Sequence, residues 1–138
     1  MPCIALHWLS RVILSYPKWL PSGIQPQVTG LKRGEVWWVN LDPTQGSEIQ
    51  KTRPAVILTV NALNRARRTV VVVPLSSSAT PRPPIVVSAP SAGAGSVAVC
   101  DQVRTVDKSR LTERIGQISE SDLASIGVGI AQVLGLVR

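Results

Sequence analysis

The sequence predicts a mainly β domain with one C-terminal helix, folded as a compact, strongly bent sheet or a small barrel. Short apolar and β-branched runs recur between residues 31 and 118, and turn-forming residues end each of them. After residue 118 the apolar residues recur instead at spacings of three and four, which is typical of a helix. A chain of 138 residues has room for one hydrophobic core, which favours a single domain.

The strands are predicted one after another, with short connections. Residues 35–41 alternate around two tryptophans and stop at Asp42-Pro43. Residues 53–60 form a nearly continuous apolar run, which predicts a strand that is buried on both faces. A helical turn at residues 61–66 and a β-branched strand at residues 69–75 follow. Proline and glycine turns separate the last predicted strands, which are residues 85–88, 97–106 and 111–118.

The C-terminal helix is predicted to begin after Ser119. This serine is a good N-cap, and Asp122 stands where its carboxylate is expected to reach back to the cap. Gly127 and Gly129 weaken the helix in isolation, so we expect it to pack against the sheet or a partner. Its apolar face is formed by Leu123, Ile126, Ile130, Val133 and Leu134.

Residues 1–30 differ from the rest of the chain, and we expect the domain to occupy residues 31–138. The first 30 residues hold two tryptophans, four prolines and no acidic residue. A signal peptide fits poorly, because no basic segment precedes the apolar run and Arg11 interrupts it. Three interpretations stay open: a disordered or weakly helical extension, a start-site artefact with the true start near residue 28 or 31, and a membrane-surface or regulatory arm.

The charge of the chain indicates an anionic partner. The formal net charge is +7, which favours nucleic acid, an acidic protein or an anionic membrane, although a solvated basic surface is the plain alternative. No apolar run approaches the length of about 18 residues that a membrane-spanning helix needs. Cys3 and Cys100 are predicted to be free thiols in a reducing cytoplasm.

The chain contains few of the side chains that usually catalyse nucleic-acid cleavage. His7 is the single histidine, which excludes a two-histidine acid–base nuclease within one chain. The eight acidic residues are scattered, which argues against a two-metal carboxylate site, and no cofactor is predicted. Arginine and hydroxyl groups are the chemistry that remains.

Three polar segments are candidates for one site. The first is the loop from Gly46 to Arg53, which ends where a buried strand begins. The second is Ser76-Ser77-Ser78 at the end of a strand, and the third is the polar interruption at residues 101–104. A guanidinium at the rim of a sheet fits phosphate well because its five donors are fixed in a fork. Arg53 can equally pair with Glu48 or a carbonyl, and the serines can form an ordinary loop.

One reaction fits these groups: the attack of an RNA 2′-hydroxyl on its own adjacent phosphate. The substrate supplies the nucleophile, so the protein has only to stabilise charge on the phosphorus and manage two protons. Arginine is better suited to the electrostatic part of this task than to proton transfer, because its pKa is so high.

Two other groups of residues stay open to two interpretations. Arg65, Arg67 and Arg68 can track phosphates or can form a solvated turn. Trp37 and Trp38 alternate along a strand, so one is expected in the core and the other at the surface, at an interface or stacked on RNA.

The segments RGEVWWVNLDPTQGSEIQKTRPAVIL, VVVPLSSS and CDQVRTVDKSRLTERIGQIS resemble, in this order, motifs of the MazF/PemK family of toxin endoribonucleases. The resemblance implies a small SH3-like β-barrel (CcdB/MazF-like) with a C-terminal helix, acting as a homodimer. It implies metal-independent cleavage of single-stranded RNA, leaving a 2′,3′-cyclic phosphate and a 5′-hydroxyl. It also implies a cognate MazE-like antitoxin whose acidic, disordered segment covers the RNA groove.

The resemblance also implies roles for particular residues. Arg53 and Ser76 match the catalytic arginine and hydroxyl, and Glu48 matches an auxiliary acid–base position. The family usually has threonine where Ser76 stands, and serine leaves the rotamer freer. The predicted RNA-binding residues are Ser47, Lys51, Ser77, Asp101, Gln102 and Arg104.

Two alternatives to an mRNA-cleaving toxin are kept. One is a CcdB-like toxin that binds DNA gyrase and has no nuclease site. The other is a toxin-derived RNA-binding protein without activity, or one that cuts structured RNA such as tRNA or rRNA. The Arg53/Ser76 pair separates them, because a pure binding module does not require it.

Overall fold

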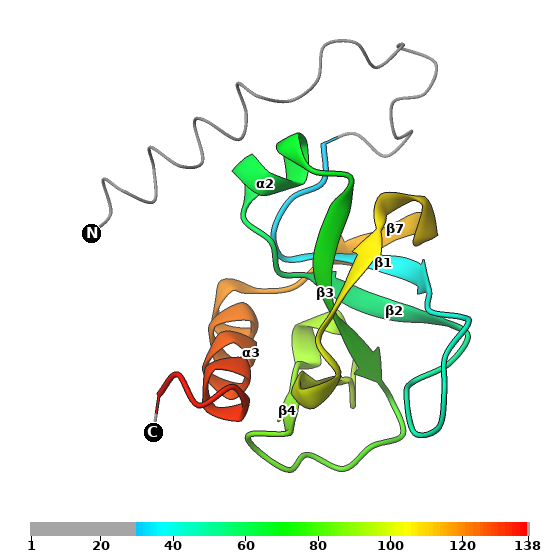
Figure 1. Cartoon of the computed structure of the whole chain (residues 1–138). Helices are drawn as coiled ribbons and strands as arrows, with labels where there is room; N and C mark the ends of the chain where they lie inside the picture. The colour runs from blue at the N-terminus through cyan, green and yellow to red at the C-terminus, as the bar shows by residue number, and fades with distance from the viewer. Residues whose placement is uncertain (1–29, 138) are drawn as a thin grey trace, which may run out of the picture.

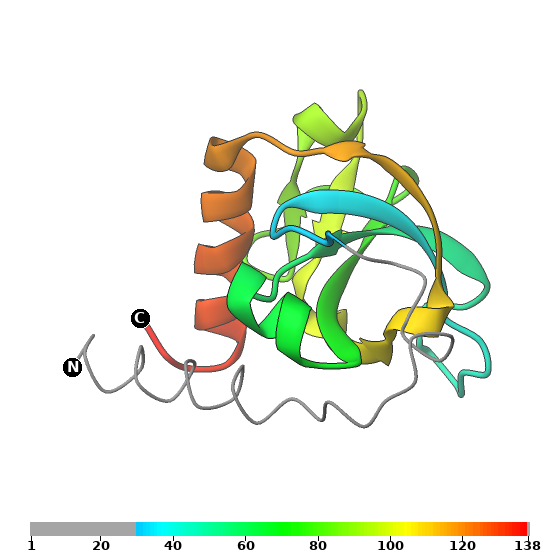
Figure 2. The same cartoon turned by 90° about the horizontal axis from the view of Figure 1, so that it is seen from above.

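A strongly bent antiparallel sheet forms the body of the molecule, and one helix stands against its side (Figures 1 and 2). The computed structural model describes residues 30–137. The strand order is β4-β5-β3-β2-β1-β7, and β6 also pairs with β3. The strands are β1 Glu35–Asn40, β2 Thr52–Ile57, β3 Thr69–Ser76, β4 Val86–Ser88, β5 Val97–Val99, β6 Arg104–Asp107 and β7 Leu111–Gln117. The predicted mainly β fold with a C-terminal helix is confirmed.

Two helices and three 3₁₀ turns connect or cover these strands. α2 (Asn61–Ala66) links β2 to β3, and α3 (Glu120–Val133) closes the chain. The 3₁₀ turns are η2 (Pro90–Ala92), η3 (Cys100–Gln102) and η4 (Lys108–Arg110). None of the helices within residues 30–137 combines the length and the apolar character needed to cross a membrane.

The sheet is buried on both sides over the second half of β2. Ala55 and Ile57 belong to the cluster inside the barrel, together with Val39 and Val72. Val56 belongs to a second cluster between the sheet and α3. The predicted burial of residues 53–60 on both faces is therefore confirmed for residues 55–57 and wrong for the two ends of the run, residues 53 and 60, which are exposed.

β2 ends three residues earlier than predicted. After Ile57, the Thr59 hydroxyl accepts a hydrogen bond from the Val71 N–H at 2.6 Å, and the Thr59 carbonyl accepts one from the Asn64 amide at 2.8 Å. Hydrogen bonds from side chains thus replace the next backbone hydrogen bonds between β2 and β3, and the chain continues into α2.

The predicted strand at residues 97–106 is interrupted. β5 and β6 lie along the same edge of β3, with Ala98 opposite Leu75 and Arg104 opposite Val72. β3 advances three residues between these pairs while the other chain advances six, so the extra residues leave the ladder as the turn η3. Asp101 and Gln102 are placed on this turn, outside the regular sheet.

The start of α3 confirms one half of the predicted capping pattern. The Ser119 hydroxyl accepts a hydrogen bond from the Asp122 N–H at 3.2 Å. Asp122 does not reach back, which is a correction: its carboxylate accepts the Ser91 N–H at 2.9 Å and also the Ser91 hydroxyl. Ser91 in turn receives the Ser119 N–H at 3.0 Å. The turn η2 packs against this end of α3 and supplies the partners that a capping box would otherwise provide.

Cys100 lies in the core beneath α3 and is a free thiol, as predicted. Burial raises the pKa of this thiol to about 11, and the charge of Asp101 adds to the effect. The predictions for residues 1–29, including those for Cys3 and His7, lie outside the described residues.

Candidate functional site

Two neighbouring strands bring Arg53 and Ser76 to the same edge of the sheet. β2 pairs with β3 antiparallel, with Ala55 opposite Pro74. Extending this register by two residues places Arg53 opposite Ser76. The ladder itself ends at Ala55 and Pro74, so Arg53 and Ser76 lie just beyond it, on the same face of the sheet.

The β1–β2 loop, residues 41–51, lies beside this edge (Figure 1). The Leu41 N–H donates to the Lys51 carbonyl at 3.0 Å, and the Lys51 N–H donates to the Asp42 carboxylate at 2.9 Å. Gly46 and Lys51 have φ values of 58° and 68°, a left-handed region that costs a lysine more than a glycine. These contacts close the base of the loop.

The loop borders two hollows in the surface, on either side of Ser47, Glu48 and Ile49. The Ser76 hollow has a volume of about 450 Å³. It is lined by Ser47, Glu48, Ile49, Gln50, Lys51, Arg53, Leu75, Ser76 and Ser78. It therefore joins the predicted catalytic residues of the loop, β2 and β3.

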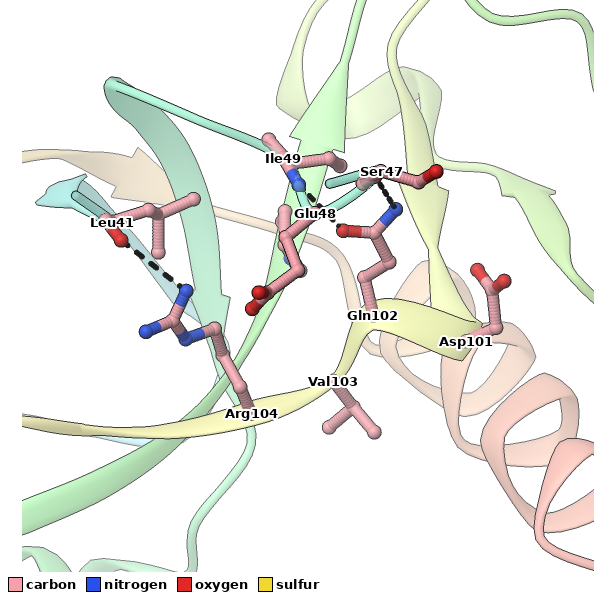
Figure 3. A pocket seen from close by; sticks show the side chains of 9 residues that line it. Leu41, Ser47, Glu48, Ile49, Asp101, Gln102, Val103 and Arg104 are labelled. Atoms are coloured by element: carbon pink, nitrogen blue, oxygen red, sulfur yellow. Dashed lines mark hydrogen bonds between the residues drawn. The ribbon is translucent and has the colours of Figure 1, made fainter. Parts of the chain in front are cut away.

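The Asp101 hollow has a volume of about 370 Å³ and opens toward η3 and β6. It is lined by Leu41, Ser47, Glu48, Ile49, Pro74, Asp101, Gln102, Val103 and Arg104. Arg104 reaches from β6 to the Leu41 carbonyl at 3.3 Å (Figure 3). The three polar segments predicted to form one site are thus brought together around the loop.

Gln102 holds the loop between the two hollows. Its amide oxygen accepts the Ile49 N–H at 2.7 Å, and its amide nitrogen donates to the Ser47 carbonyl at 3.4 Å (Figure 3). Both ends of the amide are therefore occupied by the protein backbone. This geometry gives Gln102 a positioning role for the loop in addition to its predicted place in the RNA-binding set.

The guanidinium of Arg53 is open to a ligand. Its Nε donates to the Gln50 carbonyl at 3.3 Å, and among the described residues its two terminal nitrogens donate to no protein group. Among the described residues Glu48 forms no ion pair with it, and one oxygen of the Glu48 carboxylate accepts the Gln45 N–H at 2.9 Å. Of the alternatives for Arg53, the carbonyl contact is the one observed, and it leaves the anion-binding end of the side chain exposed.

The hydroxyl of Ser76 is held by a local turn. Its Oγ accepts the Ser78 N–H at 3.2 Å, and the Ser78 hydroxyl lies 3.2 Å away. An oxygen that accepts from a backbone N–H keeps its own proton free to donate. The turn therefore restricts the rotamer that the missing methyl group leaves free.

Ser76→Ala is expected to lower the cleavage rate by about 10²–10³-fold, the cost of removing one donor to transition-state charge. Ser76→Thr is expected to stay within about threefold of the wild-type rate, because the hydroxyl and its β-branched rotamer preference suit the same turn. Initial rates on one oligonucleotide measure both effects, with Ser88→Ala as the control, because Ser88 is an exposed serine of β4 that lines neither hollow. Equal rates for Ser76→Ala and Ser88→Ala would contradict the role of Ser76.

Ser77 is the one predicted site residue that lines neither hollow, since the hollow beside β3 is lined by Ser76 and Ser78. Ser78, which belongs to the predicted serine segment but not to the predicted site residues, lines this hollow. The Ser-x-Ser pattern indicates its place, because the first hydroxyl accepts the backbone N–H two residues later in the chain. The other predicted residues, Ser47, Lys51, Asp101, Gln102 and Arg104, all line a hollow.

The two tryptophans of β1 lie outside both hollows. Trp37 packs against the core inside the barrel, and its indole N–H lies 3.4 Å from the Glu35 carboxylate. Trp38 is 38% exposed and lies opposite Pro54, one residue along from Arg53, so it points to the other face of the sheet. Trp37 is the core residue of the pair, and Trp38 the surface residue.

A small, strongly bent antiparallel barrel with a C-terminal helix defines the class of protein: it has the CcdB/MazF-like fold. The family model described as "PemK-like, MazF-like toxin of type II toxin-antitoxin system" matches residues 32–134. The chain belongs to this family, as its motifs predicted.

Relatives and solved structures agree with this assignment. The chain is 38% identical over 108 residues to endoribonuclease PemK of Escherichia coli, covering 75% of this chain and 81% of the relative. It is 33% identical to endoribonuclease MazF9 of Mycobacterium tuberculosis, covering 70% and 89%. The crystal structure of MazF from Deinococcus radiodurans matches with a TM-score of 0.69 and 28% identity, covering 76% and 96%. A MazE-MazF structure from the same organism matches with a TM-score of 0.62 and 26% identity, covering 78% and 97%. The CcdB-like alternative is not favoured.

Proposed function

We propose that this chain cleaves single-stranded RNA at short sequences without a metal ion, and that the 2′-hydroxyl of the substrate is the nucleophile. The observation that carries this proposal is that Arg53, Ser76 and Glu48 line one hollow at the rim of the sheet. The names of the relatives, endoribonucleases PemK and MazF9, support RNA as the substrate.

The step divides between the residues by their chemistry. The 2′-oxygen attacks the adjacent phosphorus, and the bond from phosphorus to the 5′-oxygen breaks. Arg53 binds the non-bridging oxygens as their charge grows, and the Ser76 hydroxyl donates to one of them. The second oxygen of Glu48 takes the proton of the 2′-hydroxyl. The 5′-oxygen takes a proton from water at this open rim, so the products are a 2′,3′-cyclic phosphate and a 5′-hydroxyl.

The Asp101 hollow is assigned to a nucleotide next to the cleaved phosphate. Ser47 and Asp101 offer a hydroxyl and a carboxylate to the edge of a base. Arg104 in this hollow and Lys51 in the Ser76 hollow offer positive charge to the RNA backbone. The two hydrogen bonds of the Gln102 amide to the loop backbone fix the position of the loop between the two hollows. Because this recognition depends on loop residues, we expect the sequence of the β1–β2 loop to determine which RNA sequences are preferred.

The remaining parts of the proposal concern partners and location. We propose a homodimer that is inhibited by a MazE-like antitoxin through an acidic, disordered segment, since the net charge of +7 suits such a partner. The MazE-MazF structures of Deinococcus radiodurans support an antitoxin of this kind. We also propose a cytoplasmic location, and residues 1–30 as an extension outside the toxin domain.

End-group analysis of the cleaved RNA tests the reaction. The purified protein is incubated with RNA in the presence of EDTA, and the new ends are mapped. We expect 5′-hydroxyl and 2′,3′-cyclic phosphate ends, and no cleavage of the same sequence carrying 2′-O-methyl groups. Loss of cleavage in EDTA, or 5′-phosphate ends, would show that the mechanism is wrong. Intact RNA under all conditions would show that the function itself is wrong.

A further inference from the structure

The end of the barrel at α2 carries three exposed arginines that the site does not use. Arg65 lies in the last turn of α2, and Arg67 and Arg68 follow it before β3 begins. Within residues 30–137 their guanidinium groups make no ion pair with a carboxylate, whereas Arg114 pairs with Glu35 at 2.7 Å. These arginines therefore present their donors to solvent.

One acidic residue, Asp107, lies near Arg68. Asp107 is opposite Thr69 in the β3–β6 ladder, and Arg68 directly precedes Thr69 in the sequence. Hydrogen bonds from Ser109 lower the pKa of Asp107 most, and the charges of Arg68 and Arg110 lower it further. One carboxylate thus lies between two arginines, and the surface keeps a positive excess.

Two further arginines belong to β6 and η4, which connect the Asp101 hollow with this end of β3. The guanidinium of Arg110 donates to the Asn40 carbonyl at 3.1 Å and also to the Asp42 carbonyl, where the β1–β2 loop begins. Arg104, at the other end of β6, lines the Asp101 hollow and donates to the Leu41 carbonyl. The positions of Arg104 and Asp107 are about 10 Å apart along the strand, from the rise per residue of a β-strand.

We propose that these five arginines form a basic track that binds the phosphates of the RNA strand as it leaves the Asp101 hollow. The track consists of Arg104, Arg110, Arg68, Arg67 and Arg65. It rests on the proposed function, and it extends the substrate from the nucleotides in the two hollows to a longer single strand. Contacts to phosphate carry no base sequence, so the track adds affinity and leaves the cleaved sequence unchanged.

Continuity with the hollows favours RNA over an acidic peptide as the occupant. A strand whose phosphate lies against Arg53 would continue through the neighbouring hollow to Arg104. From there β6 runs along β3 to Asp107, opposite Thr69, the residue that follows Arg67 and Arg68. Guanidinium groups suit phosphate oxygens because of their fork of donors.

Salt-dependent binding of 2′-O-methyl oligonucleotides tests the track, since these bind without being cut. The triple variant Arg65→Ala, Arg67→Ala, Arg68→Ala is expected to make the slope of log affinity against log salt shallower by about 2. Each phosphate contact on a single strand contributes about 0.7 to this slope, and the variant loses three such contacts. Over a fourfold rise in salt the wild type then loses roughly 20-fold more affinity than the variant. This holds for an oligonucleotide of about 20 nucleotides and is absent for one of about 6, which fills only the hollows.

Two controls separate charge from folding. Lysine at the same three positions keeps the charge, so its salt slope is expected to match the wild type. Arg82→Ala removes an exposed arginine beside β4, away from the track, and is expected to leave the slope unchanged. Thermal unfolding of each variant verifies that the barrel is intact.

The outcomes distinguish the two proposals. A wild-type slope in the triple alanine variant overturns the track, even where the wild type still cuts RNA. If the variant keeps its RNA affinity but loses affinity for a polyglutamate peptide, the surface serves an acidic protein and the RNA track is wrong. If the slope changes as expected but the wild type never cleaves RNA, the track stands and the proposed reaction fails.

Discussion

Arg53→Ala is expected to lower the rate of RNA cleavage by about 10²–10³-fold, or below detection, without unfolding the protein. The side chain is exposed, and within residues 30–137 its one hydrogen bond runs from Nε to the Gln50 carbonyl at 3.3 Å, so its removal leaves no buried group unpaired. What is lost is the fork of donors facing the hollow. Initial rates under saturating substrate, together with a thermal unfolding curve, measure the two effects separately.

Arg53→Lys refines this result. A lysine keeps the charge but cannot bind two phosphate oxygens in a plane, so we expect an intermediate rate. Arg82→Ala serves as the matched control, because it removes an exposed arginine outside both hollows. Equal rates for Arg53→Ala and Arg82→Ala would remove Arg53 from the site.

Gly129→Ala is expected to destabilise the fold by about 1–2 kcal/mol, the usual cost of overpacking less the gain in helix propensity. A Cβ at this position would lie 2.9 Å from Val87 Cγ2, 3.0 Å from the Pro84 carbonyl and 3.1 Å from Cys100 Sγ. α3 therefore approaches the sheet so closely that only glycine fits. For a domain of this size the melting temperature is expected to fall by roughly 5–10 °C.

Gly127→Ala provides a control of opposite sign in the same helix. A Cβ at Gly127 meets nothing within 4 Å, so the substitution gains helix propensity without a clash. We expect an increase of about 0.5–1 kcal/mol in the free energy of unfolding. Denaturant titrations of both variants give the two signs. A stabilising Gly129→Ala would mean that the helix does not pack as closely as described.

The two glycines of α3 differ in a way that the sequence of the helix does not predict. Periodicity predicted the helix, its need for packing and four residues of its apolar face, all of which depend on neighbouring residues. Leu134 is a correction: the helix ends at Val133, so Leu134 is its C-cap, and its side chain is 59% exposed. Periodicity did not distinguish Gly127 from Gly129, because the difference arises from Val87, Pro84 and Cys100 on other elements. The capping pattern has the same limit: Ser119 was predicted as the cap, but the partner of Asp122 is Ser91, 31 residues away.

The sequence by itself determined the strands, the helix, the family and the residue types available for catalysis, since these follow from local periodicity, motifs and the single histidine. The tertiary structure decided which of those residues meet. The antiparallel pairing of β2 with β3 brings Arg53 and Ser76 to one hollow. The three residues that leave the ladder at η3 place Gln102 against a loop residue 53 positions away, and the turn after β3 places Ser78, and not Ser77, in the hollow. Register and loop closure depend on contacts between segments far apart in the chain, and a local pattern carries no information about them.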